Sequence, residues 1–216
     1  MFKHETQVIK FLLQWYSMNA RKLPWRKKNN LNLPHPYFVF VSEYMLQQTT
    51  VNTVKNKFND FILKWPSLNK LAQTSEPNIL KFWSGLGYYS RARNLLKSAK
   101  IIKNNFKNNI PQTYDELIQL PGIGDYTAKA ILGIGFNQSV MPLDANIERI
   151  LVRLHAIDKP INKVKNKLKD LGKKFISDKY SSNLIQSFMD YGSEICLPRN
   201  PKCNICGINK FCQSYK

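Results

Sequence analysis

The sequence predicts an all-α fold, and three observations carry that prediction. Apolar residues recur at the three- and four-residue spacing of amphipathic helices along almost the whole chain. The strict alternation that marks a half-buried strand is scarce. Prolines and glycines stand between the periodic segments, where they would end helices. At 216 residues and 43% hydrophobic content, the chain is long enough for one or two domains with a sizeable core.

The expected helices follow one another along the chain. The first lies at Lys10–Tyr16, and one long helix is expected at Tyr37–Phe61. The remaining apolar stripes predict helices at Leu68–Leu71, Ile79–Trp83, Arg91–Ile102, Tyr114–Leu120, Tyr126–Gly133, Ala145–Ile157, Val164–Ile176 and Leu184–Tyr191. No run of about 18 apolar residues is present, so we expect no membrane span.

Positive charge dominates the composition. Lys and Arg number 33 against 14 Asp and Glu, which gives a formal charge of +19. A field of this sign attracts polyanions, and nucleic acid is the partner that it favours. Lysines beside asparagines also reflect the base composition of a genome, so charge alone leaves a merely basic enzyme as the alternative.

All four cysteines fall in one short C-terminal segment with the pattern C-x6-C-x2-C-x5-C, at Cys196, Cys203, Cys206 and Cys212. Four thiolates so close in sequence can converge on one metal ion or cluster. Disulfides are one alternative, although the chain starts with no secretory signal and its core-forming part is long enough to be stable without disulfides. Zinc is the other, because Cys-x2-Cys is common in zinc sites. The spacing alone leaves both open.

A glycine-containing turn, Leu120-Pro121-Gly122-Ile123-Gly124, joins two short expected helices. Two glycines around one apolar residue allow a tight turn with exposed backbone amides. These amides would lie at the start of the next helix, which is an anion site suited to a DNA phosphate. A plain helix–helix turn is the alternative. Followed by Tyr-Thr-Ala, the segment resembles the helix–hairpin–helix motif of the DNA glycosylases related to endonuclease III.

That resemblance implies a role for the cysteines, because the same superfamily carries this cysteine pattern around one 4Fe–4S cluster. It extends from Leu23-Pro24-Trp25-Arg26 to Cys212. It implies a six-helix barrel domain at residues 27–136, with the hairpin at about 120–124. It also implies a helical iron–sulfur domain made of residues 1–26 and 137–216, with the cluster loop at 196–212. The active site is expected in the cleft between the two domains.

Two carboxylates are candidates for the chemistry. On a helix, Glu43 shares its face with Val39, Phe40, Leu46 and Gln47, and apolar surroundings raise a carboxyl pKa and suit a general acid. A buried Glu paired with an unseen Arg is the alternative. Asp144 precedes the helix expected from Ala145 and is a helix N-cap candidate, where the helix dipole stabilises the ionised form. One neutral acid and one ionised carboxylate are the pair needed to break a glycosidic bond.

The segments Ser42–Thr49 and Gly85–Asn94 resemble the corresponding motifs of MutY-type adenine DNA glycosylases, which remove adenine mispaired with 8-oxoguanine. The resemblance implies that Glu43 protonates the departing adenine and that Asp144 stabilises the oxocarbenium-like sugar, with support from Tyr126 and Asn146. It implies that Arg26 and Gln186 hold the extruded base. It also implies DNA contacts by Gln47, Gln48, Tyr88, Gly122 and Gly124. Of Tyr88 and Tyr89, one is expected to lie in the core instead.

Three features depart from the family pattern. The chain ends four residues after Cys212, so the C-terminal domain that helps MutY proteins recognise 8-oxoguanine is expected to be absent. Ala145 stands where the family usually has Gly, and Asn29–Leu33 has the character of a short insertion. Asp144-Ala145-Asn146 and the short length are similar to thymine glycosylases that act on T·G mismatches, which are the alternative enzymes. The Gln-Gln and Gly-Tyr-Tyr segments together favour adenine.

Two further alternatives remain. One is a non-catalytic cluster-containing DNA-binding protein, which the presence of both carboxylates disfavours. The other is uracil or abasic-site lyase chemistry, but lyase relatives place a lysine where this chain has Tyr126. We therefore expect a monofunctional DNA N-glycosylase that binds one 4Fe–4S cluster. Its expected partner is double-stranded DNA with A·8-oxoG or A·G mispairs, and we expect a monomer in the bacterial cytoplasm at the nucleoid.

Overall fold

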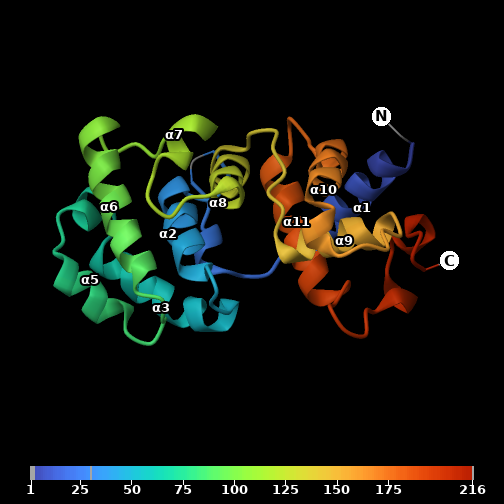
Figure 1. Ribbon diagram of the computed structural model, residues 1–216, viewed down its shortest axis with the longest axis horizontal. Coiled ribbons are helices and arrows are strands. Elements are labelled where there is room, and N and C mark those ends of the chain that lie inside the picture. The colour runs from blue at the N-terminus through green and yellow to red at the C-terminus, as the bar shows by residue number, and fades with distance from the viewer. Residues whose placement is uncertain (1–2, 30, 216) are drawn as a thin grey trace. The chain divides into compact units, whose positions relative to one another are not determined.

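The computed structural model describes residues 3–29 and 31–215 (Figure 1). Within those ranges the chain forms helices and loops with no β-strand, and one antiparallel bridge joins Lys28 to Pro34. The all-α prediction is thus confirmed. In the described part of the chain, no helix has both the length and the apolar character needed to cross a bilayer. The chain divides into two compact units, Lys22–Phe136 and the combination of Met1–Arg21 with Asn137–Lys216.

Helix α2 (Pro36–Leu46) is the central element of the unit Lys22–Phe136. It begins at Pro36, whose fixed φ suits a first helical turn, and the His35 Nδ1 atom accepts a hydrogen bond from the Tyr37 N–H at 3.3 Å. Eight of its eleven residues are buried, because α2 packs against helices on several sides. Its neighbours are α3 (Val51–Lys64), α6 (Ser90–Asn105), α8 (Asp125–Ala130), the π-helical turn η2 (Ile131–Gly135) and η1 (Pro24–Arg26). The unit also contains α4 (Leu68–Ala72), α5 (Glu76–Trp83) and α7 (Tyr114–Ile118).

The single long helix expected at Tyr37–Phe61 is wrong, since the chain breaks between α2 and α3. Gln48 adopts a left-handed backbone with φ +54°, and Thr50 caps α3 by accepting the Thr53 N–H at 3.3 Å. Neither Gly nor Pro marks this break in the sequence. A tertiary contact stabilises it instead, because the Arg91 side chain of α6 binds carbonyl groups at the end of α2.

The other unit is built around α11 (Ser181–Glu194), which packs against α1 (Lys3–Asn19) and α9 (Ala145–Leu154). The rings of Phe11 and Trp15 on α1 meet the Tyr191 ring edge-on, with centroids 5.9 and 5.0 Å apart. Helix α10 (Lys165–Gly172) packs on α9 and continues into a 3₁₀ turn, so the helix expected at Val164–Ile176 is shorter than predicted. The short turns of this unit are η3 (Ile161–Lys163), η4 (Lys173–Phe175), η5 (Cys203–Ile205) and η6 (Asn209–Phe211).

The segment Asn29–Leu33, expected as a short insertion, is a tight loop. The Asn29 side-chain oxygen accepts the backbone N–H groups of Leu31 and Leu33, at 2.9 and 3.1 Å. Asn30 lies outside the described residues. The Lys28–Pro34 bridge closes the base of the loop.

Candidate functional site

Glu43 lies on α2 with only 6% of its surface exposed. Its neighbours one turn back, Val39 and Phe40, are buried as the helical spacing predicted. A buried carboxyl group lowers stability unless the surrounding structure compensates for its desolvation, so its retention in a largely apolar helix marks a candidate functional position.

The turn between α7 and α8 is held against the same helix. Gly122 has φ +81°, and a Cβ atom there would lie 3.0 Å from side-chain atoms of Asn94 and Tyr44, so both the backbone conformation and the limited space favour glycine. The Tyr44 hydroxyl donates to the Pro121 carbonyl at 2.5 Å, and the Gln47 side chain donates to the Gly122 carbonyl at 3.1 Å. The helix that carries Glu43 therefore fixes the hairpin directly.

Gly124 caps the N-terminus of α8, and a Cβ atom added there would meet no heavy atom within 4 Å, so the backbone approach to this helix start is open. Tyr126 follows in the first turn and is half-buried. Lys129, one turn further on, forms an ion pair with Asp125 at 2.8 Å. Arg26 is half-buried at the end of η1.

Gln48 and Tyr88 are the exposed tips of two neighbouring loops. Both adopt left-handed backbone conformations, with φ +54° and +45°. Tyr88 is 62% exposed and Tyr89 is 42% exposed, so the expectation that one of this pair lies in the core is wrong. Gly85 and Gly87 have φ values of +87° and +70°, and these turns direct both rings outward.

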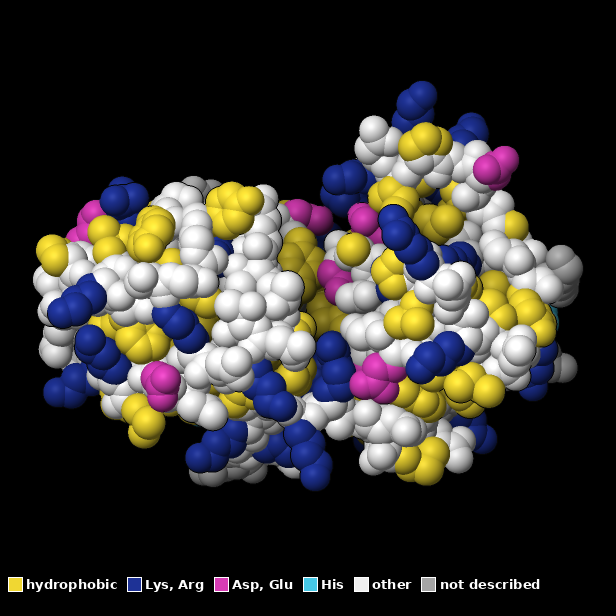
Figure 2. All heavy atoms as spheres, turned by 90° about the horizontal axis from the view of Figure 1, so that it is seen from below, with side chains coloured by type: hydrophobic (Ala, Val, Ile, Leu, Met, Phe, Trp, Pro, Cys, Tyr) yellow, Lys and Arg dark blue, Asp and Glu magenta, His cyan; other side chains and the backbone are white. Residues whose placement is uncertain are grey.

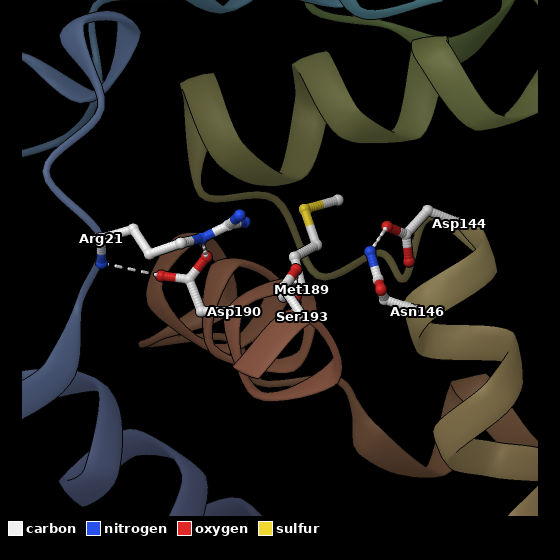
Figure 3. Close-up of polar contacts among 6 residues, drawn as sticks. All are labelled: Arg21, Asp144, Asn146, Met189, Asp190 and Ser193. Atoms are coloured by element: carbon white, nitrogen blue, oxygen red, sulfur yellow. Dashed lines mark hydrogen bonds and ion pairs between the residues drawn. The ribbon is translucent and has the colours of Figure 1, made fainter. Parts of the chain in front are cut away.

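Asp144 is the N-cap of α9, as predicted (Figure 3). Its Oδ1 accepts the Ile147 backbone N–H at 2.7 Å, and its Oδ2 accepts the Asn146 side-chain N–H at 2.8 Å. Burial raises the pKa of the Asp144 carboxyl, and these hydrogen bonds together with the Arg149 charge lower it in part. The N-cap position was expected to favour the ionised form, but desolvation outweighs that effect.

Arg149 links this carboxylate to the start of the cysteine segment. Its guanidinium donates to the Asn146 Oδ1 at 2.8 Å, to the Gly192 carbonyl at 2.6 Å and to the Cys196 carbonyl at 2.7 Å. Asn146 in turn donates to Asp144, so one chain of hydrogen bonds joins α9, α11 and the cysteine segment.

Two helices meet closely at this point. A Cβ atom on Gly192 of α11 would lie 2.6 Å from the Asn146 Cβ and 3.2 Å from its Cα, so the first turn of α9 packs directly against the backbone of α11 at this glycine. A part-buried ion pair between Arg21 and Asp190 of α11, at 2.6 Å, ties the segment that follows α1 to α11 (Figure 3). The close approach of Gly192 to Asn146 constrains the position of the α9 N-terminus.

Gln186 is buried on α11, with 2% of its surface exposed. Its Nε2 donates to the backbone carbonyl of Ser182 at 3.0 Å and to the Ser182 hydroxyl at 3.2 Å. Its Oε1 is buried and has no hydrogen-bond partner among the described residues. An unpaired buried acceptor carries a free-energy cost that a bound donor would remove.

The four cysteines line one cavity, together with apolar residues of α9 and the C-terminal loop. None of them is in a disulfide, which removes the disulfide interpretation in this structure. Arg153 donates to the Cys196 Sγ and Tyr191 donates to the Cys206 Sγ, each at 3.3 Å. Within the described ranges, no group of three or more His, Cys, Asp or Glu is placed to hold a metal ion.

The donors to this cavity are themselves fixed in place. The Tyr191 hydroxyl accepts the Gly207 N–H at 3.0 Å, and any Cβ on Gly207 would collide with the Phe11 ring. Burial is the largest effect on Tyr191 and on Cys212, and it raises the pKa of both groups. Four thiols around one cavity, with hydrogen-bond donors directed at two of them, match the ligand chemistry of a soft-metal centre, although among the described residues they do not form a metal-holding group.

Sequence reasoning missed Arg91, Arg149 and Tyr191. Arg149 and Tyr191 contact residues brought close only by the tertiary fold, across separations of up to 47 positions, so no local pattern marks them. Arg91 stands inside the Gly85–Asn94 motif, which is the one signal that could have drawn attention to it.

Comparison with known proteins places the chain in a family. Residues 41–174 match the HhH-GPD superfamily of base excision DNA repair proteins. The adenine DNA glycosylase of Buchnera aphidicola subsp. Baizongia pistaciae is 45% identical over 94% of this chain and 57% of its own length. That of Rattus norvegicus is 39% identical over 95% of this chain and 41% of its own length. The chain thus spans little more than half of the bacterial relative.

Among solved structures, a thermostable thymine-DNA glycosylase superposes with a TM-score of 0.88 at 26% identity, over 99% of this chain and 97% of that one. The matched family segment includes the C-terminal part of α2, the hairpin, α9 and α10, and so it contains both Glu43 and Asp144. The chain belongs to the HhH-GPD superfamily of base excision DNA repair proteins.

Proposed function

We propose that this chain hydrolyses the N-glycosidic bond of adenine mispaired with 8-oxoguanine or guanine in duplex DNA. The observation that carries the proposal is the buried carboxyl of Glu43 on a helix that also anchors the hairpin through Tyr44 and Gln47. Sequence identity supports adenine as the base, since the relatives at 45% and 39% identity are both adenine DNA glycosylases.

The proposed chemistry divides two tasks between two carboxyl groups. Glu43 donates a proton to a ring nitrogen of adenine as the bond from the base to C1′ breaks, and the base leaves with the bonding electron pair. Asp144, ionised, stabilises the positive charge that develops on the sugar. Water then adds to C1′ and loses a proton, so the products are free adenine and an abasic site. Tyr126 and Asn146 support this site, and Asn146 does so through its hydrogen bond to Asp144.

Recognition of the extruded base is assigned to Arg26 and Gln186. The Oε1 of Gln186 is the buried acceptor without a partner, and the exocyclic amine of adenine is a donor that would satisfy it. The match is in keeping with adenine, whose amine occupies the position of the thymine O4 carbonyl, while the one donor of thymine is its N3–H.

DNA binding is assigned to the two loop tips and the hairpin. Gln48 and Tyr88 would enter the base stack beside the lesion, with Gln47 behind them, and the amides around Gly122 and Gly124 would contact a phosphate. Lys and Arg side chains are spread over the face drawn in Figure 2, where Asp and Glu are few, in keeping with the +19 formal charge. We propose that the protein acts as a monomer.

A thymine glycosylase acting on T·G mismatches is the second candidate. It is favoured by the close superposition on the thymine-DNA glycosylase and by Ala145 after Asp144. The identity to that protein is 26%, well below the 45% to the Buchnera enzyme, and this difference supports adenine as the first choice.

We assign the cysteine cavity to one 4Fe–4S cluster, held by Cys196, Cys203, Cys206 and Cys212. Such a cluster joins separate irons to separate thiolates and would hold the C-terminal loop in place. Protein purified under anaerobic conditions should contain about four iron and four sulfide per chain, as one cluster requires. Stoichiometric zinc without iron would overturn this assignment.

The test of the catalytic assignment is Glu43→Gln in a single-turnover assay on an A·8-oxoG duplex. The amide preserves the shape but cannot donate the proton, so base release should be lost while duplex affinity stays near that of the wild type. The exposed Glu76→Gln is the matched control and should retain full activity. Substantial base release by Glu43→Gln would rule out its role as the acid.

The product provides a second test. Tyr126 cannot form a Schiff base as a lysine does, and Lys129 is engaged with Asp125. Strand scission should therefore require added alkali or heat. A borohydride-trapped covalent complex of wild-type protein and DNA would contradict the monofunctional assignment.

A further inference from the structure

Arg91 on α6 is a buried cation surrounded by backbone carbonyl groups. Arg91 has only 5% of its surface exposed, and its guanidinium has no carboxylate partner among the described residues. A buried charge without a counter-ion destabilises the fold unless many hydrogen bonds satisfy it. The identity of those acceptors therefore indicates what the residue holds together.

The acceptors come from two loops that are far apart in sequence. One nitrogen, NH1, donates to the carbonyls of Tyr44, Met45 and Gln47 at the end of α2, at 3.2, 2.7 and 2.5 Å. The other, NH2, donates to the carbonyls of Leu86 and Gly87 at 2.8 and 2.9 Å. Nε adds a longer bond to the Tyr88 carbonyl at 3.4 Å.

Each of these loops ends in an exposed tip with a left-handed backbone. Gln48 follows Gln47 at φ +54°, and Tyr88 follows Gly87 at φ +45°. Non-glycine residues persist in this strained conformation only where the surrounding structure fixes it. The guanidinium supplies that fixation for both tips at once, and the Tyr88 ring lies 5.7 Å from its carbon.

A second and weaker link joins the same two loops. The Thr49 hydroxyl lies 3.4 Å from the Gln47 carbonyl and 3.3 Å from the Leu86 carbonyl. Trp83 Nε1 donates to the Gly87 carbonyl at 3.1 Å and so stabilises the loop that carries Tyr88. The two tips are therefore parts of one hydrogen-bonded assembly with Arg91 at its centre.

We propose that Arg91 is a positioning residue that sets the spacing of Gln48 and Tyr88 as a two-pronged wedge, and so determines how well the protein opens the base stack at a mispair. This inference rests on the proposed function. The planar guanidinium can serve carbonyls on both sides, whereas a lysine ammonium is a point charge with three donors and cannot span the two loops. Arg91→Lys thus keeps the charge and removes the link.

The experiment is a double-mutant cycle on binding and on single-turnover adenine release from an A·8-oxoG duplex. Arg91→Lys should weaken binding to the lesion duplex and slow base extrusion, each by about tenfold or more, as expected when a contact shifts by near 1 Å. A fluorescent base beside the mispair reports the rate of extrusion. In a Tyr88→Ala background the same substitution should have a clearly smaller effect, because only the Gln48 prong then remains for Arg91 to position.

Arg93→Lys is the matched control, since Arg93 lies on the same helix in an exposed ion pair with Glu76 and should tolerate the change. Hydrogen exchange without DNA adds a readout of position: the amides of residues 47–49 and 86–88 should both exchange faster in Arg91→Lys. If Arg91→Lys fails to fold, Thr49→Val removes the other link between the loops and should show the same pattern in weaker form.

Equal losses from Arg91→Lys in the wild-type and Tyr88→Ala backgrounds would overturn the inference and indicate a general packing role. Unchanged exchange in either loop would overturn it as well. Failure of the proposed function is distinguishable, because then the wild type and Arg93→Lys would also release no adenine.

Discussion

A glycine-to-alanine change at Gly192 tests how the unit that contains the cysteine segment positions the Asp144 carboxylate. Gly192 lies inside α11, where the first turn of α9 rests on its backbone. The added methyl group would be 2.6 Å from the Asn146 Cβ, whereas ordinary contact begins at 3.4 Å. The two helices must therefore separate by about 0.8 Å at this point, and the displaced turn is the one that Asp144 caps.

The expected magnitudes follow from this geometry. Overpacking of a tight contact costs about 1–3 kcal/mol of folding free energy. Alanine recovers about 0.5–1 kcal/mol relative to glycine within a helix, so the net destabilisation should be about 0–2.5 kcal/mol. A displacement of nearly 1 Å at a catalytic group can slow the reaction by about a hundredfold. Activity should therefore fall much further than stability.

The measurements are the free energy of unfolding in urea and the single-turnover rate of adenine release. Gly172→Ala is the matched control, because Gly172 is also helical and its methyl group would meet only the end of the Leu143 side chain at 3.3 Å and the Met141 side chain at 3.4 Å. The control should remain active and as stable as the wild type. Wild-type rate and stability in Gly192→Ala would show that the contact between α9 and α11 does not fix the position of Asp144.

The remaining predictions concern pH, redox behaviour and salt. Burial raises the pKa of Asp144, and the role proposed for this residue requires the ionised form. Activity should therefore be lost on acidification at a higher pH than an ordinary aspartate would give, and Arg149→Met should move this limb higher still. A limb at the usual aspartate pKa would contradict this. Tyr191→Phe removes a hydrogen bond to the Cys206 sulfur but keeps the ring, so voltammetry should find a more negative reduction potential for the proposed cluster. The control Tyr37→Phe should leave the potential unchanged. An equal potential in the wild type and both variants would show that the hydrogen bond has no influence. Duplex affinity should fall with salt at a log–log slope of about −0.9 per phosphate neutralised, and a flat response would place the positive charge away from the DNA.

The sequence was sufficient for the fold class because periodicity and caps are local. The Asp144 cap was predictable, since an aspartate directly before an amphipathic segment accepts the backbone N–H three residues on. The break between α2 and α3 was not, because no glycine or proline marks it. It depends on carbonyls bound by Arg91, a residue 44 positions away from Gln47, and contacts of that range leave no local pattern.

The candidate site was predictable as a set of residue types rather than as a geometry. Motif resemblance selected Glu43, Asp144 and the cysteines, but it gave no reason for Arg149 to join Asn146 to the Cys196 carbonyl. The expectation of ordinary core packing for one of Tyr88 and Tyr89 was wrong, because both are exposed and backbone turns at glycines determine where adjacent rings point. Side-chain direction in loops follows from φ and from tertiary hydrogen bonds, neither of which periodicity reveals.

Side-by-side single-turnover assays on A·8-oxoG, A·G, T·G and U·G duplexes test the central claim most directly. The acid proposed at Glu43, the charge-stabilising carboxylate proposed at Asp144 and the unpaired acceptor of Gln186 together predict release of free adenine from the first two duplexes and little or no release of thymine or uracil. Glu43→Gln should abolish the adenine signal. Faster release of thymine from T·G than of adenine from either duplex would contradict the assignment and identify the protein as a thymine glycosylase.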